Sequence, residues 1–357
     1  MFAKTSIFDI IILGVIMENI YGYTLEMLEE YLASIGEKKF KANQLYDWLY
    51  KKRVNSFDDM TNVGKATIQK LKEHFSLKKI EIVTKETGKD VSKYLFNLHD
   101  NNKIEAVLMY HDYGTSLCVS SQVGCNMSCS FCESGRLKKV RNLETYEMVQ
   151  ELLLIEKYEN VRISHVVLMG IGEPFDNYDN VMRFIDIINE DKGIGIGARH
   201  ITVSTCGIVP KIEEFSKNKK QVNLAISLHA SNDELRKKLM PIAKAYSLDE
   251  LMSAIKKYLA NDGRRVTFEY IMLKDVNDKE ENALELAKLL KGMNAYVNLI
   301  PYNETSHIEY KKSSKDTIMK FYDTLKKNNI NVTIRKEFGG TVSAACGQLR
   351  SNYKEGK

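Results

Sequence analysis

This sequence of 357 residues has few long apolar runs, only four prolines and a low net charge. The formal net charge is only +5, which excludes a chain that is polycationic throughout, so any basic surface has to be local. The apolar run at residues 7–16 contains Asp9, is too short to span a bilayer and is followed by no small-residue cleavage site. We therefore expect a cytoplasmic protein without a membrane contact. Met17 is an alternative start, which makes residues 1–16 either a start-site artefact or a disordered tail.

Cysteine is also rare, with six residues in the chain and no sign of a secretory context. In a reducing compartment, clustered cysteines indicate a metal site or catalysis rather than disulfides. Cys125, Cys129 and Cys132 lie on one short loop with the spacing Cx3Cx2C. Thiolates suit zinc and iron–sulfur clusters, and closed sites of either kind normally take four protein ligands. Candidates for a fourth ligand are scattered, so the spacing favours an iron–sulfur cluster with one open iron over a zinc site.

The region before this loop is rich in lysine and is predicted to be helical, from residue 24 to about 95. Thr24 can cap a first helix that ends near Gly36, and residues 41–52 place apolar side chains on one face of a second. A single lysine there is most simply a solvated surface residue, but the cluster favours contact with an RNA phosphate backbone. The cluster comprises Lys38, Lys39, Lys41, Lys51, Lys52, Arg53, Lys65, Lys70, Lys72, Lys78 and Lys79. We therefore predict an RNA-binding domain at residues 17–95.

The rest of the chain alternates short apolar runs with helical patterns. The predicted strands are 104–110, 116–120, 165–169, 199–204, 222–228, 266–273, 296–300 and 331–335. The predicted helices are 145–158, 177–189, 248–259, 280–290 and 314–328. Apolar strands separated by helices indicate a parallel sheet that is covered on both faces. About six such units, short of the eight in a full barrel, predict an α/β fold: a partial, open (β/α)6 barrel over residues 96–350, with a flexible tail at 351–357.

Polar groups recur where the predicted strands end, on the side of a barrel that carries chemistry. In the segment 170–174, Gly172 lets the backbone approach a ligand, and Glu173 offers an acceptor for an ammonium group. Each of the other groups alone could be a satisfied strand-end cap, but their recurrence favours a shared ligand. They lie at Ser204, in the segment of Ser227, Leu228 and His229, and at Asn303.

Three further cysteines lie outside the loop. Cys346 is flanked by small residues, which suggests an accessible thiol on a mobile loop after the last strand. Cys118 precedes the cysteine loop and is predicted to lie near the same barrel mouth. Cys206 is read as an inert, buried residue.

The cysteine loop, with Phe131 before its last ligand, resembles that of the radical S-adenosylmethionine (SAM) superfamily, in which a [4Fe-4S] cluster binds SAM at its open iron. Five motifs make the resemblance more specific and are similar to those of the RlmN/Cfr family of RNA methyltransferases. They are LCVSSQVGC at 117–125, MGIGEP at 169–174, AISLHA at 225–230, NLIP at 298–301 and AACGQL at 344–349. The resemblance runs over residues 25–349, nearly the whole chain.

The resemblance implies a reaction that uses two SAM molecules per turnover. The Cys346 thiolate first takes a methyl group from one SAM. A second SAM on the cluster yields a radical that activates this methyl group, and the resulting carbon radical adds to adenine. Cys118 then resolves the protein–RNA tether through a transient disulfide, while Glu105 removes the ring proton. The implied partners are 23S rRNA, tRNA and an electron donor such as flavodoxin or ferredoxin, and we expect a monomer.

RlmN-type members methylate carbon 2 of adenine, whereas Cfr-type members methylate carbon 8. Pro174 and the segments 197–200 and 41–44 are more similar to the RlmN type, and residues 338–339 lean toward Cfr. Methylation of carbon 2 is therefore predicted, with carbon 8 as the alternative.

The sequence departs from the usual RlmN pattern at Glu133, Cys206 and Ala243, which leaves open a diverged paralogue with an altered RNA substrate. Two hypotheses from other classes also remain. One is a zinc-stabilised RNA-binding protein without catalysis, and the other is a different radical SAM reaction that has no use for Cys118 and Cys346.

Overall fold

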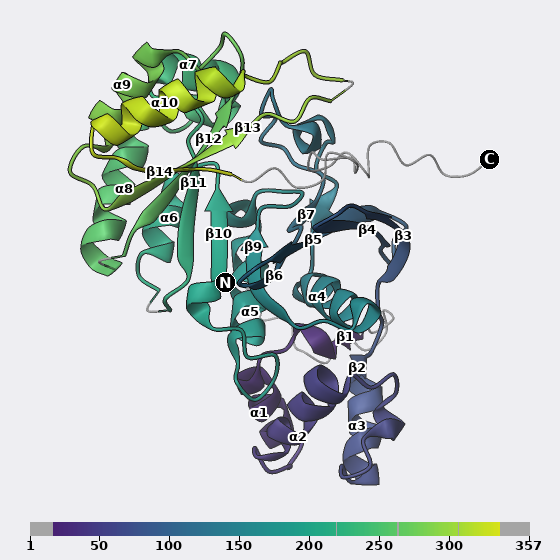
Figure 1. Ribbon diagram of the computed structural model, residues 1–357. Helices are drawn as coiled ribbons and strands as arrows, with labels where there is room; N and C mark the ends of the chain where they lie inside the picture. Colours follow the sequence, from purple (N-terminus) through teal and green to yellow (C-terminus); the bar gives the residue numbers. More distant parts are fainter. Residues whose placement is uncertain (1–16, 219, 263, 306, 336–357) are drawn as a thin grey trace, which may run out of the picture.

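The computed structural model describes residues 17–335 apart from 219, 263 and 306 (Figure 1). A ten-stranded mixed sheet runs through this part of the chain. In sheet order its strands are β14 (Asn331–Ile334), β13 (Ala295–Pro301), β12 (Val266–Met272), β11 (Asn223–Ser227), β10 (Ile201–Thr205), β9 (Ile163–Leu168), β6 (Gly114–Cys118), β5 (Lys103–His111), β4 (Val91–Asn97) and β3 (Glu81–Thr87).

In this sheet β6 and the six strands β9 to β14 pair in parallel with their neighbours. Helices cross between successive strands: α4 (Thr145–Glu159), α5 (Tyr178–Asn189), α6 (Val209–Phe215), α7 (Asp233–Leu239) with α8 (Leu248–Asp262), α9 (Glu280–Leu290) and α10 (Lys315–Lys327). In the described part of the chain β14 does not pair with β3, so the sheet stays open. The predicted partial (β/α)6 barrel is therefore confirmed. After its last helix, α10, the chain adds one more strand, β14, to the edge of the sheet.

The antiparallel strands β3, β4 and β5 extend the sheet beyond β6 (Figure 1). The helical region predicted up to residue 95 is wrong for residues 81–97, which form β3 and β4. Six of the seven residues of β4 are buried, because the strand lies between two neighbours and forms part of the inner wall of the barrel.

The helical unit at the N-terminus contains α1 (Leu25–Ser34), α2 (Lys41–Tyr46), η3 (Asp47–Lys52), η4 (Phe57–Asp59) and α3 (Lys65–His74). Two-residue strands, β1 (Glu18–Asn19) and β2 (Phe75–Ser76), join its two ends. The predicted cap is present, since the Thr24 hydroxyl accepts a hydrogen bond from the Met27 N–H at 3.2 Å. Arg53 forms an ion pair with the buried Glu156 of α4, which ties the unit to the barrel.

Several lysines of this unit already have partners within the protein. Lys41 pairs with Glu37, and Lys72 pairs with Asp58. Lys52 lies 3.5 Å from the centre of the Trp48 ring, beside its ion pair with Asp47. The part of the predicted basic cluster that is available to contact RNA is therefore smaller than its number of lysines suggests.

No helix among the described residues has both the length and the apolar character needed to cross a membrane.

A candidate active site at the mouth of the barrel

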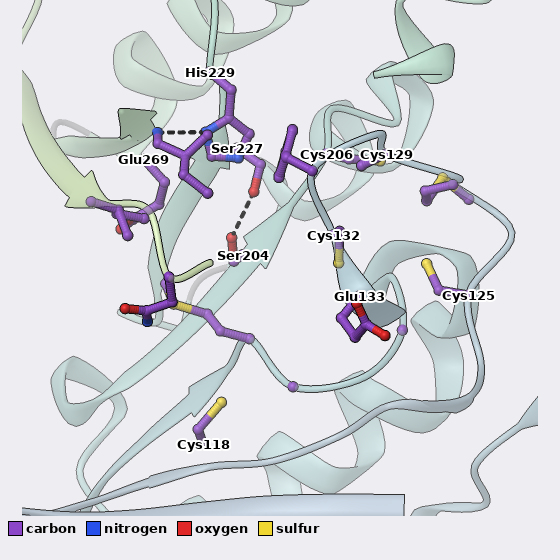
Figure 2. A pocket seen from close by; sticks show the side chains of 18 of the residues that line it. Cys118, Cys125, Cys129, Cys132, Glu133, Ser204, Cys206, Ser227, His229 and Glu269 are labelled. Atoms are coloured by element: carbon purple, nitrogen blue, oxygen red, sulfur yellow. Dashed lines mark hydrogen bonds between the residues drawn. The ribbon is translucent and has the colours of Figure 1, made fainter. Parts of the chain in front are cut away.

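A cavity of about 340 Å³ lies where the parallel strands end, between the cysteine loop, the extension strands and the loops after β9 to β13. Figure 2 shows the side chains around it. Ten of the residues predicted from the sequence line its wall: Cys118, Cys125, Cys129, Cys132, Gly172, Glu173, Ser204, Ser227, His229 and Asn303. The fold thus brings together residues that lie up to 185 positions apart in the chain, from 118 to 303.

The cysteine loop is closed at its base by a short ladder in which β7 (Gln122–Val123) pairs with β8 (Arg141–Asn142). Its far side is held by the Ser130 N–H, which donates to the carbonyl of Leu239 at 2.9 Å. Because Leu239 is the last residue of α7, the loop is fixed against a helix from the opposite part of the barrel.

Cys125, Cys129 and Cys132 surround one end of the cavity (Figure 2). Burial raises the pKa of Cys125 to about 12, and it also raises the pKa of Cys129 and Cys132 above the usual thiol value. The thiols are therefore protonated at neutral pH without a metal, and a bound metal has to displace these protons. Three thiols on one side of a largely apolar cavity fit an iron–sulfur cluster that leaves one iron accessible.

Glu173 is buried, and both of its carboxylate oxygens accept backbone hydrogen bonds. Oε1 accepts from the Phe175 N–H at 3.0 Å, and Oε2 accepts from the Cys206 N–H at 2.8 Å. Burial raises the pKa of this carboxyl group, and the hydrogen bonds oppose the shift. A carboxylate oxygen has a second acceptor position, so Glu173 can cap its own loop and still accept from a ligand in the cavity.

The glycines beside Glu173 serve the protein's own packing. Gly172 has φ +111°, and a Cβ there would lie 2.7 Å from the Cβ of Gln122. A Cβ on Gly170 would lie 2.5 Å from the carbonyl oxygen of Val119. The two glycines therefore let the segment that leads to the cysteine loop lie directly on the end of β9. Both glycines also line the cavity, so the close approach to a ligand that the sequence predicts stays a prediction.

Ser204 is the last but one residue of β10 and Ser227 is the last residue of β11, and their hydroxyl oxygens lie 3.5 Å apart (Figure 2). His229 follows with its backbone in the left-handed region, at φ +58°. Its Nδ1 accepts a hydrogen bond from the Ile271 N–H at 3.1 Å, and burial lowers its pKa to about 3. The ring is therefore neutral at physiological pH and carries its proton on Nε2.

Leu228 does not line the cavity, because its side chain is fully buried in the main core. Glu105 is also outside the lining residues, although it is only 2% exposed. Alternation along β5 places it on the same face as Val107 and Met109, which do line the cavity, and Val107 pairs with Cys118. Cys346 lies outside the described residues.

Sequence reasoning missed three polar residues that line the cavity, Glu269, Lys93 and Arg335. Glu269 of β12 is buried and accepts a hydrogen bond from Asn298 Nδ2 at 2.8 Å, and burial raises its pKa. Lys93 of β4 is 2% exposed, and Arg335 follows β14. A usable signal existed for two of them, because Lys93 and Glu269 each interrupt an apolar strand.

The three departures from the family pattern are accommodated by the structure. Ala243 and Cys206 are buried. Glu133 is 3% exposed, and its Oε1 lies 3.2 Å from Arg136 Nη1 and 3.0 Å from His307 Nδ1. One oxygen of the extra buried carboxylate therefore has an arginine and a histidine ring beside it, on the surface side of the cysteine loop.

The sequence matches two family models. Residues 119–287 match the radical SAM superfamily, and residues 18–77 match the N-terminal domain of ribosomal RNA large subunit methyltransferases. A protein of Spiroplasma citri, named as a probable dual-specificity RNA methyltransferase RlmN, is 53% identical over 339 residues, which cover 94% of this chain and 98% of that protein. A protein of the same name from Enterococcus faecalis is 53% identical over 343 residues, 94% of this chain and 96% of that protein.

The chain belongs to the RlmN family. A crystal structure of a radical SAM methyltransferase from Sphaerobacter thermophilus supports the assignment at the level of the fold, with a TM-score of 0.87 and 40% identity over 93% of this chain and 98% of that one. The predicted family and enzyme class are thus confirmed, and the Cfr alternative is not favoured. Membership of the radical SAM superfamily implies a [4Fe-4S] cluster and SAM, which argues against a site that holds only zinc.

Proposed function

We propose that this chain methylates carbon 2 of an adenosine in 23S rRNA and of the adenosine next to the anticodon in tRNA. The names of its relatives support an RNA substrate of two kinds. The strongest structural support is the position of Cys118, which lines the same cavity as the three loop cysteines, as Cys206 also does. A reaction that only generates a radical has no use for this thiol.

Cys125, Cys129 and Cys132 would hold the [4Fe-4S] cluster, with SAM at the remaining iron. Glu173, Ser204, Ser227, His229 and Asn303 line the space beside it, where their polar groups can orient SAM. When bound and reduced by a donor such as flavodoxin or ferredoxin, the pair supplies a carbon-centred radical. The neutral His229 adds no further positive charge beside the sulfonium, in a wall that already contains Lys93 and Arg335.

The residues of the chain carry the methyl group. The Cys346 thiolate takes a methyl group from a first SAM, so an S–C bond forms and the sulfonium S–CH3 bond breaks. After loss of one hydrogen atom, this carbon bonds to carbon 2 of adenine and links the RNA to Cys346. The adduct would give up one electron to the cluster, which is oxidised after passing its electron to SAM, and Glu105 would accept the proton from carbon 2.

Cys118 releases the product. Its thiolate attacks the Cys346 sulfur, so an S–S bond forms while the bond between this sulfur and the carbon breaks. The electron pair of the broken bond stays with the carbon, which takes up a proton and becomes the methyl group. An external thiol then reduces the disulfide before the next turnover.

The N-terminal unit would bind the RNA backbone. Residues 18–77 match a domain named for ribosomal RNA methyltransferases, and the exposed lysines beside α2 supply a positive surface. The enzyme would act as a monomer in the cytoplasm.

Two cysteine variants test the proposal. Cys346→Ala should abolish methyl transfer to RNA, whereas Cys118→Ala should accumulate a covalent protein–RNA adduct that is visible as a shifted band. Iron content serves as the control, because neither residue belongs to the cysteine loop, and both variants should retain the iron content of the unmodified enzyme. Full methyl transfer by Cys346→Ala would rule out the methyl-cysteine route.

A further inference from the structure

Arg236 of α7 is an anomaly next to the candidate active site. Its side chain is completely buried, with 0% exposed. Nη2 donates a hydrogen bond to the carbonyl of Cys206 at 2.7 Å. Within residues 17–335, Nε and Nη1 have no hydrogen-bond partner. A buried guanidinium normally has all of its N–H groups satisfied, so this arrangement is incomplete as it stands.

The charge of Arg236 is also poorly compensated. In the described ranges no carboxylate forms an ion pair with it. Asp233, one turn earlier on α7, interacts with it electrostatically, but the Oδ1 of Asp233 accepts a hydrogen bond from the Leu248 N–H at 2.9 Å. Arginine does not lose its proton in proteins, so the cost of burying this charge has to be offset by an anion.

The helix α7, which carries Arg236, contacts the cysteine loop. Ser130 of the loop binds the carbonyl of Leu239, three residues after Arg236. Cys129 packs against a buried cluster that contains Cys206 and Leu239. Burial lowers the pKa of Arg236, as expected for a guanidinium without water around it. The guanidinium is thus hydrogen-bonded to the backbone of Cys206, a residue of the same cluster against which the proposed ligand Cys129 packs.

We propose that Arg236 is the buried counter-charge of the iron–sulfur cluster and favours its reduced state. A [4Fe-4S] cluster with three thiolate ligands carries a net negative charge, and reduction adds one more. A fixed cation nearby stabilises both states and stabilises the reduced state more, which raises the reduction potential. This role rests on the proposed cluster and adds a residue outside its ligands that tunes it.

The test compares three variants of the reconstituted enzyme by potentiometric titration, with the electron paramagnetic resonance signal of the reduced cluster as the readout. Arg236→Met removes the charge, and Arg236→Lys keeps it. Lys238→Met is the matched control, because it removes one positive charge from the same helix at a side chain that is 67% exposed and pairs with Glu234. Charges in water are screened and should act weakly on the cluster.

For Arg236→Met we expect a ratio of reduced to oxidised cluster at least tenfold lower at a fixed potential, which is about 59 mV for a one-electron couple. Arg236→Lys should stay close to the unmodified enzyme, and so should Lys238→Met. An unchanged potential in Arg236→Met would overturn the proposal. Iron content and the resonance signal of the unmodified enzyme show whether the cluster is present at all. If the unmodified enzyme has no cluster, the proposed function fails, and this result is distinct from an unchanged potential in Arg236→Met.

Thermal unfolding of the protein without iron covers the case in which Arg236→Met assembles no cluster. As a counter-charge, Arg236 destabilises the iron-free protein, so Arg236→Met should melt at the same or a higher temperature while Arg236→Lys still assembles the cluster. If instead both variants lose the cluster and the iron-free Arg236→Met protein melts at a lower temperature, Arg236 has only a packing role and the proposal is wrong.

Discussion

The carboxylate of Glu173 accepts a hydrogen bond from the backbone N–H of Cys206 at 2.8 Å. This bond joins the loop after β9 to the loop after β10, at the edge of the cavity. The carboxylate is thereby held in one orientation, with acceptor positions left over for a ligand. Glu173 therefore caps its own loop, and the binding role that we propose for it would use the remaining acceptor positions.

Glu173→Gln should weaken SAM binding to the iron-loaded enzyme. An amide nitrogen cannot accept hydrogen bonds and carries no charge for the ammonium group of SAM. Loss of a charge-assisted hydrogen bond costs about 1.5–3 kcal/mol, which corresponds to a fall in affinity of about tenfold to a hundredfold. Equilibrium dialysis measures the affinity, and Glu214→Gln, at an exposed residue of α6, is the control. Equal affinities for the two variants would contradict this role.

Cys118 should react slowly with alkylating reagents at neutral pH. Burial raises its pKa to about 11, and Arg335 opposes the shift. A raised pKa means less thiolate at a given pH, so the alkylation rate should rise about tenfold per pH unit until the pH reaches about 11. Mass spectrometry that resolves the modified cysteine in the iron-free protein gives the profile. A rate that levels off near pH 8.5 would show that the thiol is not buried as described.

Gly172→Ala should destabilise the fold. The residue has φ +111°, and a Cβ would lie 2.7 Å from the Cβ of Gln122. We expect the free energy of unfolding in denaturant to fall by about 1–3 kcal/mol. Gly197→Ala is the control, since nothing lies within 4 Å of its Cβ position. If both variants unfold at the same denaturant concentration, the packing of this segment on β9 is looser than described.

Replacing both Lys38 and Lys39 by glutamate should weaken RNA binding. The two side chains are exposed, and they precede Phe40, which is 55% exposed. Loss of two phosphate contacts should reduce the slope of log affinity against log salt by about 1.4–1.8. The control changes Lys326 and Lys327 of α10 in the same way, at the opposite end of the molecule (Figure 1). An equal loss in both double variants would show only a general charge effect.

The sequence predicted the barrel because its strands are almost continuously apolar and its longer helices are amphipathic. The helices α6 and α7, seven residues each, were not predicted because they are too short to show a clear period. β3 was taken for helix because its residues are polar and mostly not buried, as in a solvated helix. Whether a polar strand residue faces the cavity depends on register, so Lys93 and Glu269 became site residues only in the structure.

The most direct test of the central claim is mass mapping of methylated adenosines in RNA from cells that lack or overproduce this protein. The account predicts 2-methyladenosine in 23S rRNA and next to the anticodon in tRNA, absent without the protein and restored by it. It also predicts no restoration by the Cys346→Ala variant. Methylation at carbon 8, or an unchanged pattern of methylated adenosines in cells that lack the protein, would contradict the account.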